Sequence, residues 1–164
     1  MNRAVDVVIA GVGLAITGPL VVLAAVGVKL SDGGPVLYRQ TRVGKDGADF
    51  ELLKLRTMVV GAERIGAGYA VDRGDPRITR IGRVLRRLSV DELPQLWNVI
   101  RGEMSIIGPR PTLRYQVEQY DERQRHRLDV RPGITGWAQI HGRANLTRSE
   151  EHTSELQSPY VISY

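Results

Sequence analysis

The sequence predicts an α+β fold that is mostly α-helical, with an N-terminal membrane-inserted helix, a β-hairpin and interfacial amphipathic helices. Three observations support this fold class. Residues 5–30 are almost wholly apolar, two strand-like segments flank a Lys-Asp-Gly turn, and arginines alternate with aliphatic residues at helical spacing in residues 77–88. A chain of 164 residues is long enough for one domain with a modest core.

The apolar segment of residues 1–30 is expected to enter a membrane as a helix. The run from Val7 to Val28 contains no charged residue and would form a helix about 33 Å long, which is enough to cross a bilayer. Pro19 lies near its centre, where the missing amide donor predicts a kink and leaves a carbonyl for Thr17, water or protein to satisfy. The helix can therefore span the membrane, or bend at Pro19 and leave by the face that it entered. A cleaved signal peptide or a buried core helix fits the run less well.

Charged residues flank this apolar segment. Asp6 at a membrane boundary is costly unless it is paired, and Arg3 lies within reach on a helix. The re-entrant alternative would keep Arg3, Lys29 and the basic remainder of the chain together at the cytoplasmic surface. The spanning alternative would leave only a stub of about five residues on the other side.

Composition narrows the classes of partner and of site. The 23 Lys and Arg exceed the 18 Asp and Glu, and this excess favours anionic partners such as lipid headgroups, nucleotides or nucleic acid. No cysteine is present, which excludes disulfides and thiolate chemistry. The three histidines show no metal-binding spacing, so a zinc site is not expected.

A β-hairpin is predicted after the breaker cluster of residues 31–35. Residues 36–40 and 50–58 read as its strands, and Lys45-Asp46-Gly47 supplies the turn. Residues 59–75 are rich in glycine and alanine and predict a loop that contains a short helix.

Two amphipathic helices are predicted after this loop. In residues 77–88 the aliphatic residues fall on one side and the arginines on the other, which suits a helix in an anionic membrane surface or an ordinary solvated face. A second apolar stripe runs from Leu93 to Ile100 and ends at Gly102, a residue typical of a helix C-terminus.

The residues between these two helices are candidates for chemistry. Ser89 to Glu92 matches a capping box, although Pro94 favours a helix that begins nearer Asp91. Asp91 and Glu92 would then lie in a first helical turn, whose dipole keeps acids ionised, and Asp91 would share a polar face with Gln95. An ionised carboxylate near cations suits attack on phosphorus through an acyl-phosphate intermediate.

Cationic residues that could serve such a carboxylate are nearby in the sequence. Lys54 and Arg56 point to one face of the second strand by alternation, and Arg86, Arg87 and Arg110 come from the flanking segments. Each of them alone is more often a surface charge. Phosphoryl transfer relies on positioning and charge neutralisation, so clustered Arg and Lys with Mg²⁺ on a carboxylate are the expected equipment.

Two rigid turns carry further arginines. Residues 108–111 hold Arg110 between two prolines, which lowers the entropy lost when its guanidinium binds an anion. Residues 131–137 begin with Arg131 and end with Trp137, an aromatic that could stack on a base or anchor at a membrane interface. Each segment is also consistent with a plain turn.

In combination and in this order, these segments resemble the bacterial sugar transferase family, in its small, monotopic phosphoglycosyl transferase form. The resemblance covers residues 2–147. It is carried by residues 2–6 with the helix broken at Pro19, residues 34–44, Lys54 to Met58, Ser89 to Gln95, and Gly108 to Pro111.

The resemblance implies a re-entrant helix and a catalytic domain at residues 31–147, at the cytoplasmic face of the bacterial inner membrane. The implied reaction transfers a sugar 1-phosphate from a UDP-sugar to undecaprenyl phosphate, the first membrane step of exopolysaccharide, O-antigen or glycoconjugate synthesis. It implies that Asp91 attacks the β-phosphate and releases UMP, that Glu92 assists, and that Mg²⁺ binds near Asp91. The predicted substrate-binding residues are Arg3, Asp6, Lys54, Arg56, Arg86, Gln95, Arg110, Arg131 and Arg143.

The end of the chain departs from this family pattern. Residues 148–158 resemble a translated sequencing adapter, and residues 148–164 are expected to be a non-native tail, which would leave the catalytic domain truncated at its C-terminal side. This truncation favours an alternative function as an inactive membrane-attached remnant or scaffold. A basic nucleic-acid-binding protein is a further alternative, favoured by charge but opposed by the apolar segment and the lack of a nucleic-acid motif.

Overall fold

The computed structural model describes residues 2–66 and 74–135 of the chain. These residues fall into two compact units, each described below by itself. Of the described residues, unit 1 comprises 2–12, 40–52 and 95–135, and unit 2 comprises 13–39, 53–66 and 74–94. About half of the described residues are helical and strands are also present, so the predicted mixture of helices and strands is confirmed, whereas insertion of a helix into a membrane remains a prediction.

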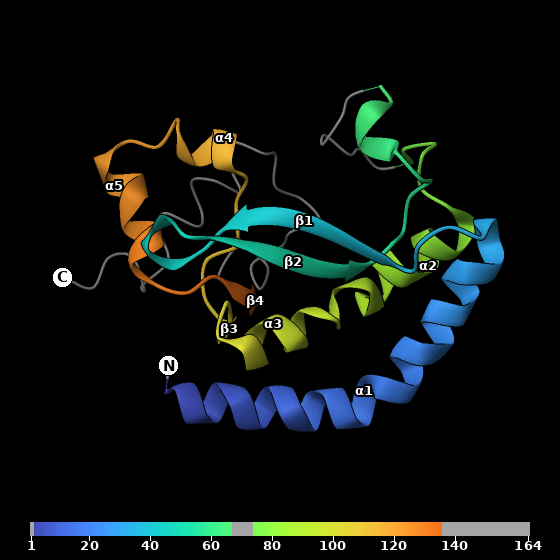
Figure 1. Cartoon of the computed structure of the whole chain (residues 1–164), viewed down its shortest axis with the longest axis horizontal. Coiled ribbons are helices and arrows are strands. Elements are labelled where there is room, and N and C mark those ends of the chain that lie inside the picture. Colours follow the sequence, from blue (N-terminus) through green and yellow to red (C-terminus); the bar gives the residue numbers. More distant parts are fainter. Residues whose placement is uncertain (1, 67–73, 136–164) are drawn as a thin grey trace. The chain divides into compact units, whose positions relative to one another are not determined.

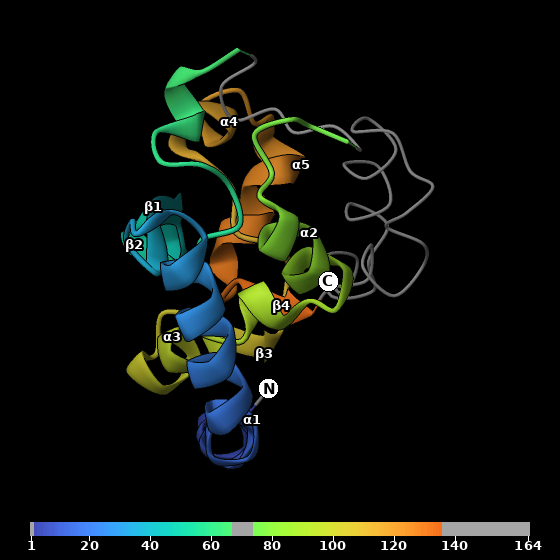
Figure 2. The same cartoon turned by 90° about the vertical axis from the view of Figure 1, so that its right-hand side faces the viewer.

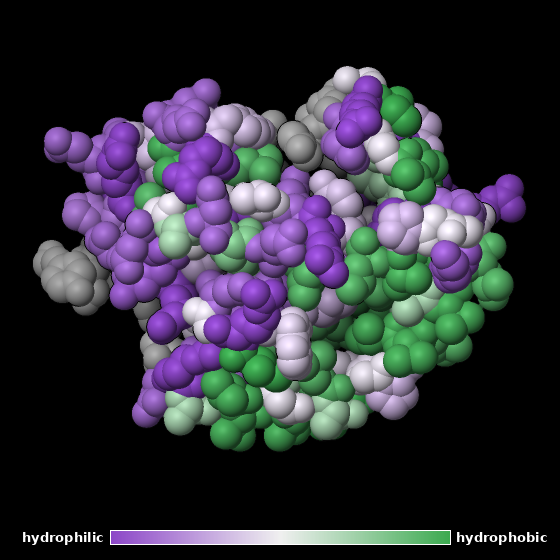
Figure 3. Space-filling model, in the orientation of Figure 1, coloured by the Kyte–Doolittle hydropathy of each residue, from purple (hydrophilic) through white to green (hydrophobic). Residues whose placement is uncertain are grey.

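The N-terminal helix α1 (Arg3–Asp32) remains helical through Pro19 and is long and apolar enough to cross a membrane. Many of its large aliphatic side chains are exposed, including Ile16, Leu23 and Leu30. The surface formed by α1 is mostly hydrophobic (green) in Figure 3. The Thr17 hydroxyl donates to the Gly13 carbonyl at 2.7 Å. A hydroxyl has one proton, so Thr17 does not satisfy the carbonyl that Pro19 leaves without its amide partner.

The predicted hairpin is confirmed. Strands β1 (Leu37–Val43) and β2 (Asp49–Leu55) form a two-stranded sheet. They lie side by side in both views (Figures 1 and 2), and their arrows point in opposite directions in Figure 1. The turn between them is the 3₁₀ segment η1 (Lys45–Gly47), in which Asp46 and Gly47 have positive φ angles of 57° and 76°. Aspartate and glycine tolerate this left-handed conformation better than most residues, which explains the turn signal in the sequence.

In unit 2 the short helix η2 (Ala62–Arg64) confirms the predicted helical turn in the loop, and helix α2 (Arg80–Arg87) begins later than expected. Thr79 caps α2 by accepting a hydrogen bond from the Gly82 amide at 2.9 Å. The preceding residues stay extended because the Val59 amide donates to the Arg77 carbonyl and Ile78 forms a β-bridge with Met58.

The core of unit 2 lies between α1, the end of β2 and α2. Its buried members are Ala24, Val28, Leu55, Leu85 and Val90. The aliphatic side of α2 therefore faces protein at Leu85, whereas Leu88 at its end is 65% exposed.

Unit 1 contains helix α3 (Gln95–Arg101), the small helices α4 (Arg114–Val117) and α5 (Glu122–Arg125) with the 3₁₀ segment η4 (His126–Asp129), and strands β3 (Ser105–Ile107) and β4 (Gly133–Thr135). The two strands pair in parallel, with Ser105 opposite Gly133. α3 ends at Gly102, whose φ is 89°, as predicted. Residues buried in the two apolar clusters of this unit are Ala10, Phe50, Leu52, Val99 and Met104, and Val43, Val117 and Tyr120.

The two arginine-bearing turns of unit 1 pack against each other through their glycines. A Cβ atom at Gly108 would lie 2.4 Å from the Arg131 carbonyl oxygen, and one at Gly133 would lie 2.1 Å from the Gly108 amide nitrogen. Only glycine permits so close a backbone approach. The sequence predicts each turn but not their contact.

The charged residues at the start of α1 form hydrogen bonds with other residues of unit 1. The buried Asp6 carboxylate accepts hydrogen bonds from the Ser105 hydroxyl at 2.9 Å and from the Ile106 amide at 3.1 Å. The Arg3 guanidinium donates to the Ile100 carbonyl at 2.8 Å and also to that of Val99, at the C-terminal end of α3. The structure thus directs Arg3 and Asp6 to different partners instead of to each other.

Replacing Asp6 with alanine should lower the free energy of unfolding by about 1–3 kcal/mol, because the buried Ser105 hydroxyl and Ile106 amide would lose their acceptor. Asp6→Asn retains an amide oxygen and is the matched control, with a smaller expected loss. Thermal or denaturant unfolding of the full chain in detergent micelles measures both. Equal stabilities of wild type and Asp6→Ala would contradict the contribution assigned to these hydrogen bonds.

Candidate functional site

The strongest candidate site in unit 2 surrounds Asp91, which lies in the 3₁₀ segment η3 (Val90–Glu92) and is only 7% exposed. Ser89 precedes it in the left-handed region, with φ of 55°, and its side chain makes no capping hydrogen bond. Helix α3 begins after Pro94, at Gln95. Ser89 thus forms no capping box, and the favoured helix start near Asp91 is also wrong, because Asp91 and Glu92 occupy a separate tight turn. A non-glycine residue at positive φ is strained, and such strain concentrates at functional sites.

Two cations accompany the acids of η3. The Lys54 ammonium at the end of β2 lies 3.9 Å from a carboxylate oxygen of Glu92, and both side chains are mostly buried. The guanidinium of Arg86, on α2, interacts electrostatically with Asp91, Asp75 and Glu92. Burial nevertheless lowers the pKa of Arg86 below its ordinary value. These groups form an acid–base cluster in which both acids are near a positive charge.

The pKa of Asp91 is raised above its ordinary value, chiefly because burial disfavours the carboxylate and secondly because Glu92 is negatively charged. Lys54 and Arg86 act in the opposite direction. The prediction that a helix dipole keeps Asp91 ionised is wrong in direction, since η3 is not the first turn of α3 and Asp91 is removed from water. The surroundings of Asp91 thus favour the protonated acid more than water does.

Thr57 connects the end of β2 to this cluster. It is 6% exposed, and its hydroxyl accepts a hydrogen bond from Nε of Arg86 at 2.7 Å. Sequence reasoning misses Thr57, because strand alternation places it with the core residue Leu55. The chain leaves the strand after Leu55, so alternation no longer applies there.

Two other arginines of unit 2 are held by local acids and carbonyls. The buried Arg56 pairs with the more exposed Asp32 and donates from Nε to the Pro35 carbonyl at 2.5 Å. Arg77 pairs with Asp75 and donates to the carbonyls of Ala62 and Ile65 at 2.9 and 2.7 Å. The hydrogen bonds that Arg77 donates to the Asp75 carboxylate lower the pKa of Asp75 to about 2. Lys54 and Arg56, which alternation places on one face, thus have different partners.

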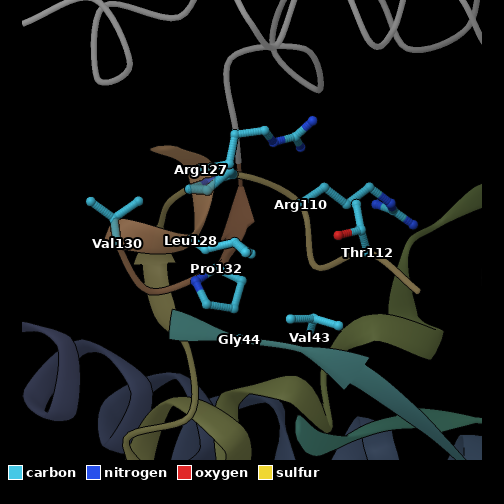
Figure 4. A pocket seen from close by; sticks show the side chains of 9 residues that line it. Val43, Gly44, Arg110, Thr112, Arg127, Leu128, Val130 and Pro132 are labelled. Carbon is cyan, nitrogen blue, oxygen red and sulfur yellow. The ribbon is translucent and has the colours of Figure 1, made fainter. Parts of the chain in front are cut away.

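The remaining predicted residues that the structure describes lie in unit 1. Gln95 is buried at the start of α3, and Arg131 donates to the Gly102 carbonyl at 3.0 Å. Arg110 lines a small pocket together with Thr112 and Arg127 (Figure 4). Arg143 and Trp137 lie outside the described residues.

A profile described as bacterial sugar transferase matches residues 1–164 of the chain. The chain belongs to the bacterial sugar transferase family. The expectation drawn from the order of its sequence motifs is thereby confirmed.

Curated relatives in this family are similar over most of the chain. A UDP-N-acetylgalactosamine-undecaprenyl-phosphate N-acetylgalactosaminephosphotransferase of Aeromonas hydrophila is 46% identical over 88% of the chain and 35% of the relative. A UDP-glucose:undecaprenyl-phosphate glucose-1-phosphate transferase of Caulobacter vibrioides is 47% identical over 92% of the chain and 57% of the relative. The exopolysaccharide production protein ExoY of Sinorhizobium fredii is 44% identical over 89% of the chain and 71% of the relative. The chain thus spans from about a third to about 70% of the length of these three family members.

Among the residues predicted from the family resemblance, the structure brings four together. Lys54, Arg86, Asp91 and Glu92 interact within unit 2. Arg56 belongs to the same unit but forms an ion pair with Asp32. The other predicted residues that the structure describes belong to unit 1: Arg3, Asp6, Gln95, Arg110 and Arg131. The cluster of two acids and two cations is therefore the candidate functional site of this chain.

The raised pKa of Asp91 predicts that Asp91→Asn increases stability at neutral pH. The folded protein binds this proton more tightly than the unfolded chain, so the free energy of unfolding falls as pH rises from the ordinary value of 3.8 through the raised value. Asparagine cannot ionise and escapes this loss. Thermal unfolding in micelles with a chelator should show Asp91→Asn above wild type at about pH 7.5, with the difference shrinking toward about pH 4. A variant that is less stable than wild type at pH 7.5 would contradict the assigned direction.

Proposed function

We propose that this chain carries the transferase centre that moves a sugar 1-phosphate from a UDP-sugar to undecaprenyl phosphate, with Asp91 as nucleophile. The observation that carries the proposal is a buried carboxylate that interacts with an adjacent acid and with Lys54 and Arg86. The names of the Aeromonas and Caulobacter relatives, which state this type of transfer, support the choice of donor and acceptor.

The transfer divides into two balanced steps. A carboxylate oxygen of Asp91 forms a bond to the β-phosphorus of the donor, while the bond from this phosphorus to the bridging oxygen breaks and UMP leaves with the electron pair. A phosphate oxygen of undecaprenyl phosphate then forms a bond to the same phosphorus, and the bond to Asp91 breaks. The second step regenerates the carboxylate, as covalent catalysis requires.

The cations around Asp91 fit the charge that this chemistry handles. A UDP-sugar brings a negatively charged diphosphate to the site, and Arg86 and Lys54 would neutralise it and orient the β-phosphate. The same cations favour the ionised form of Asp91, which is the nucleophilic form. Glu92 is held near Lys54 and would assist by accepting a proton or by binding a cation.

We also place Mg²⁺ near Asp91 in this proposal. Magnesium is commonly held by one or two carboxylates together with substrate phosphates, and the adjacent Asp91 and Glu92 offer this donor set. Within residues 2–66 and 74–135, no group of three or more acids or histidines forms a site that protein alone would complete. When bound, Mg²⁺ would neutralise part of the negative charge of the diphosphate.

The proposed location is the cytoplasmic face of the bacterial inner membrane, where a lipid-linked acceptor would be found. The exposed aliphatic residues of α1 require a cover of lipid or protein, and the length of α1 suits a bilayer. Pro19 and the flanking charges favour a re-entrant helix that keeps the basic part of the chain on one side. Arg110 and Arg131 are the residues of unit 1 that we propose for further substrate contacts.

Asp91→Asn is expected to abolish transfer, with a loss of about 10³-fold or more in the rate of UMP release, because the amide cannot form the phosphorus bond. Asp46→Asn is the matched control. Asp46 lies in the exposed η1 turn at positive φ, a conformation that asparagine tolerates, so its variant should keep wild-type activity. The assay is UMP release by the full chain in micelles with UDP-glucose, UDP-N-acetylgalactosamine and related donors.

A donor labelled in the β-phosphate should also leave a labelled phosphosugar on Asp91 when the acceptor is omitted. Mass spectrometry of the digested protein would place the adduct on the peptide that contains residue 91. UMP release by Asp91→Asn at the parental rate would overturn the nucleophile assignment. A wild-type chain that binds membranes but releases no UMP from any donor would instead favour the inactive scaffold.

A further inference from the structure

Thr57 is a buried residue that has no role in the proposed reaction steps, yet it contacts Arg86, a cation of the site. Its hydroxyl accepts the Nε proton of Arg86 at 2.7 Å, and its side chain is inaccessible to solvent apart from a few per cent. A hydrogen bond from a charged donor to a buried hydroxyl is stronger than a neutral one. This contact therefore restrains the guanidinium of Arg86.

The backbone of Thr57 is itself fixed by the start of α2. Its carbonyl accepts a hydrogen bond from the Thr79 amide at 3.0 Å and a longer one from the Thr79 hydroxyl at 3.3 Å. A Cβ atom at Gly82 would lie 2.0 Å from the Thr57 carbonyl oxygen, so glycine is required for this approach.

The residues of α2 and its cap that contact Thr57 lie on one face of the helix. Thr79, Gly82 and Arg86 are three and four residues apart, which places them on the same side of a helix. Helical side chains point back toward the N-terminus, so the long side chain of Arg86 returns along this face toward Thr57. Thr57 thus holds both the beginning of the helix and the arginine near its end.

A restraint on Arg86 matters because several charges compete for it. Asp91, Asp75 and Glu92 attract its guanidinium, and the nearby Arg77 repels it. Asp75 is paired with Arg77, whereas Asp91 is the candidate nucleophile. An arginine with free torsions would sample orientations toward either acid, and the fixed Nε contact selects among them.

We infer that Thr57 is a positioning residue whose hydroxyl orients the Arg86 guanidinium toward the Asp91 centre for binding of the donor diphosphate. The inference rests on the transfer reaction proposed above. Thr57 itself touches neither nucleophile nor donor in this scheme and acts only through Arg86.

The first test measures the hydrogen bond without any assay of activity. Full chain labelled with ¹⁵N is prepared in micelles as wild type, Thr57→Val and Thr57→Ser. Valine has nearly the shape of threonine without the hydroxyl, and serine keeps the hydroxyl. Solvent exchange of the Arg86 Nε proton should be about tenfold faster or more in Thr57→Val and close to wild type in Thr57→Ser. Unchanged exchange in Thr57→Val would overturn the inference.

The second test asks whether Thr57 acts through Arg86 during transfer. Thr57→Val should lower kcat for UMP release by about tenfold, and Thr57→Ser should restore it. In an Arg86→Met background, Thr57→Val should cause no further loss, because the partner of the hydroxyl is already absent. Equal losses in both backgrounds would show that Thr57 only supports the fold and would overturn the inference.

A failure of the proposed function is distinguishable from a failure of this inference. If the wild-type chain released no UMP, the transfer proposal would fail, and a wild-type rate of Nε proton exchange in Thr57→Val would refute the positioning role independently. If Thr57→Val did not fold, judged by circular dichroism, Arg86→Lys provides the second variant. Lysine keeps the charge but lacks the Nε donor, so a comparable tenfold loss of kcat is expected, and wild-type kcat would overturn the inference.

Discussion

Removing the Asp91 carboxylate from water costs free energy, and the folding of unit 2 places Lys54 and Arg86 where they offset part of that cost. The position of each cation relative to Asp91 depends on how the elements that carry the cations pack together. Lys54 lies at the end of β2, Arg86 lies near the end of α2, and Thr57 ties these two elements together. The geometry of the charge cluster therefore depends on one backbone junction, between the end of β2 and the start of α2.

The arginines of unit 2 divide by what fixes their guanidinium groups. Arg56 and Arg77 each combine one aspartate with backbone carbonyls, a set of partners that satisfies a buried guanidinium and closes a loop. Arg86 is held through Nε by a neutral hydroxyl while acidic side chains act on it from several sides. A neutral tether orients the guanidinium without pairing with its charge, so in the proposed reaction this charge would remain available to a diphosphate. Residue type alone does not distinguish these cases.

Local chemistry explains which features are predictable from the sequence. The η1 turn and the end of α3 follow from residues that tolerate positive φ, at Asp46, Gly47 and Gly102, because this preference is a property of the single residue. The interactions of Asp6 with Ser105 and of Arg86 with Thr57 join residues about 100 and 29 positions apart, and no periodicity encodes such pairs. Of the candidate site, the sequence therefore identifies the charged members, and the structure adds the neutral residue that holds one of them.

The charges around Asp91 also suggest how the proposed transferase centre could serve different sugars. The Aeromonas and Caulobacter relatives name different sugar donors, yet each is similar to about nine-tenths of this chain. In the proposed reaction, the charges around Asp91 would complement a diphosphate, which all UDP-sugars share, and they carry no feature that distinguishes glucose from N-acetylgalactosamine. Discrimination between sugars needs polar groups that match particular hydroxyl or acetamido positions. Under the proposed function, such groups would come from residues other than the four charged members of the cluster, so the choice of sugar could vary while the phosphoryl chemistry is retained.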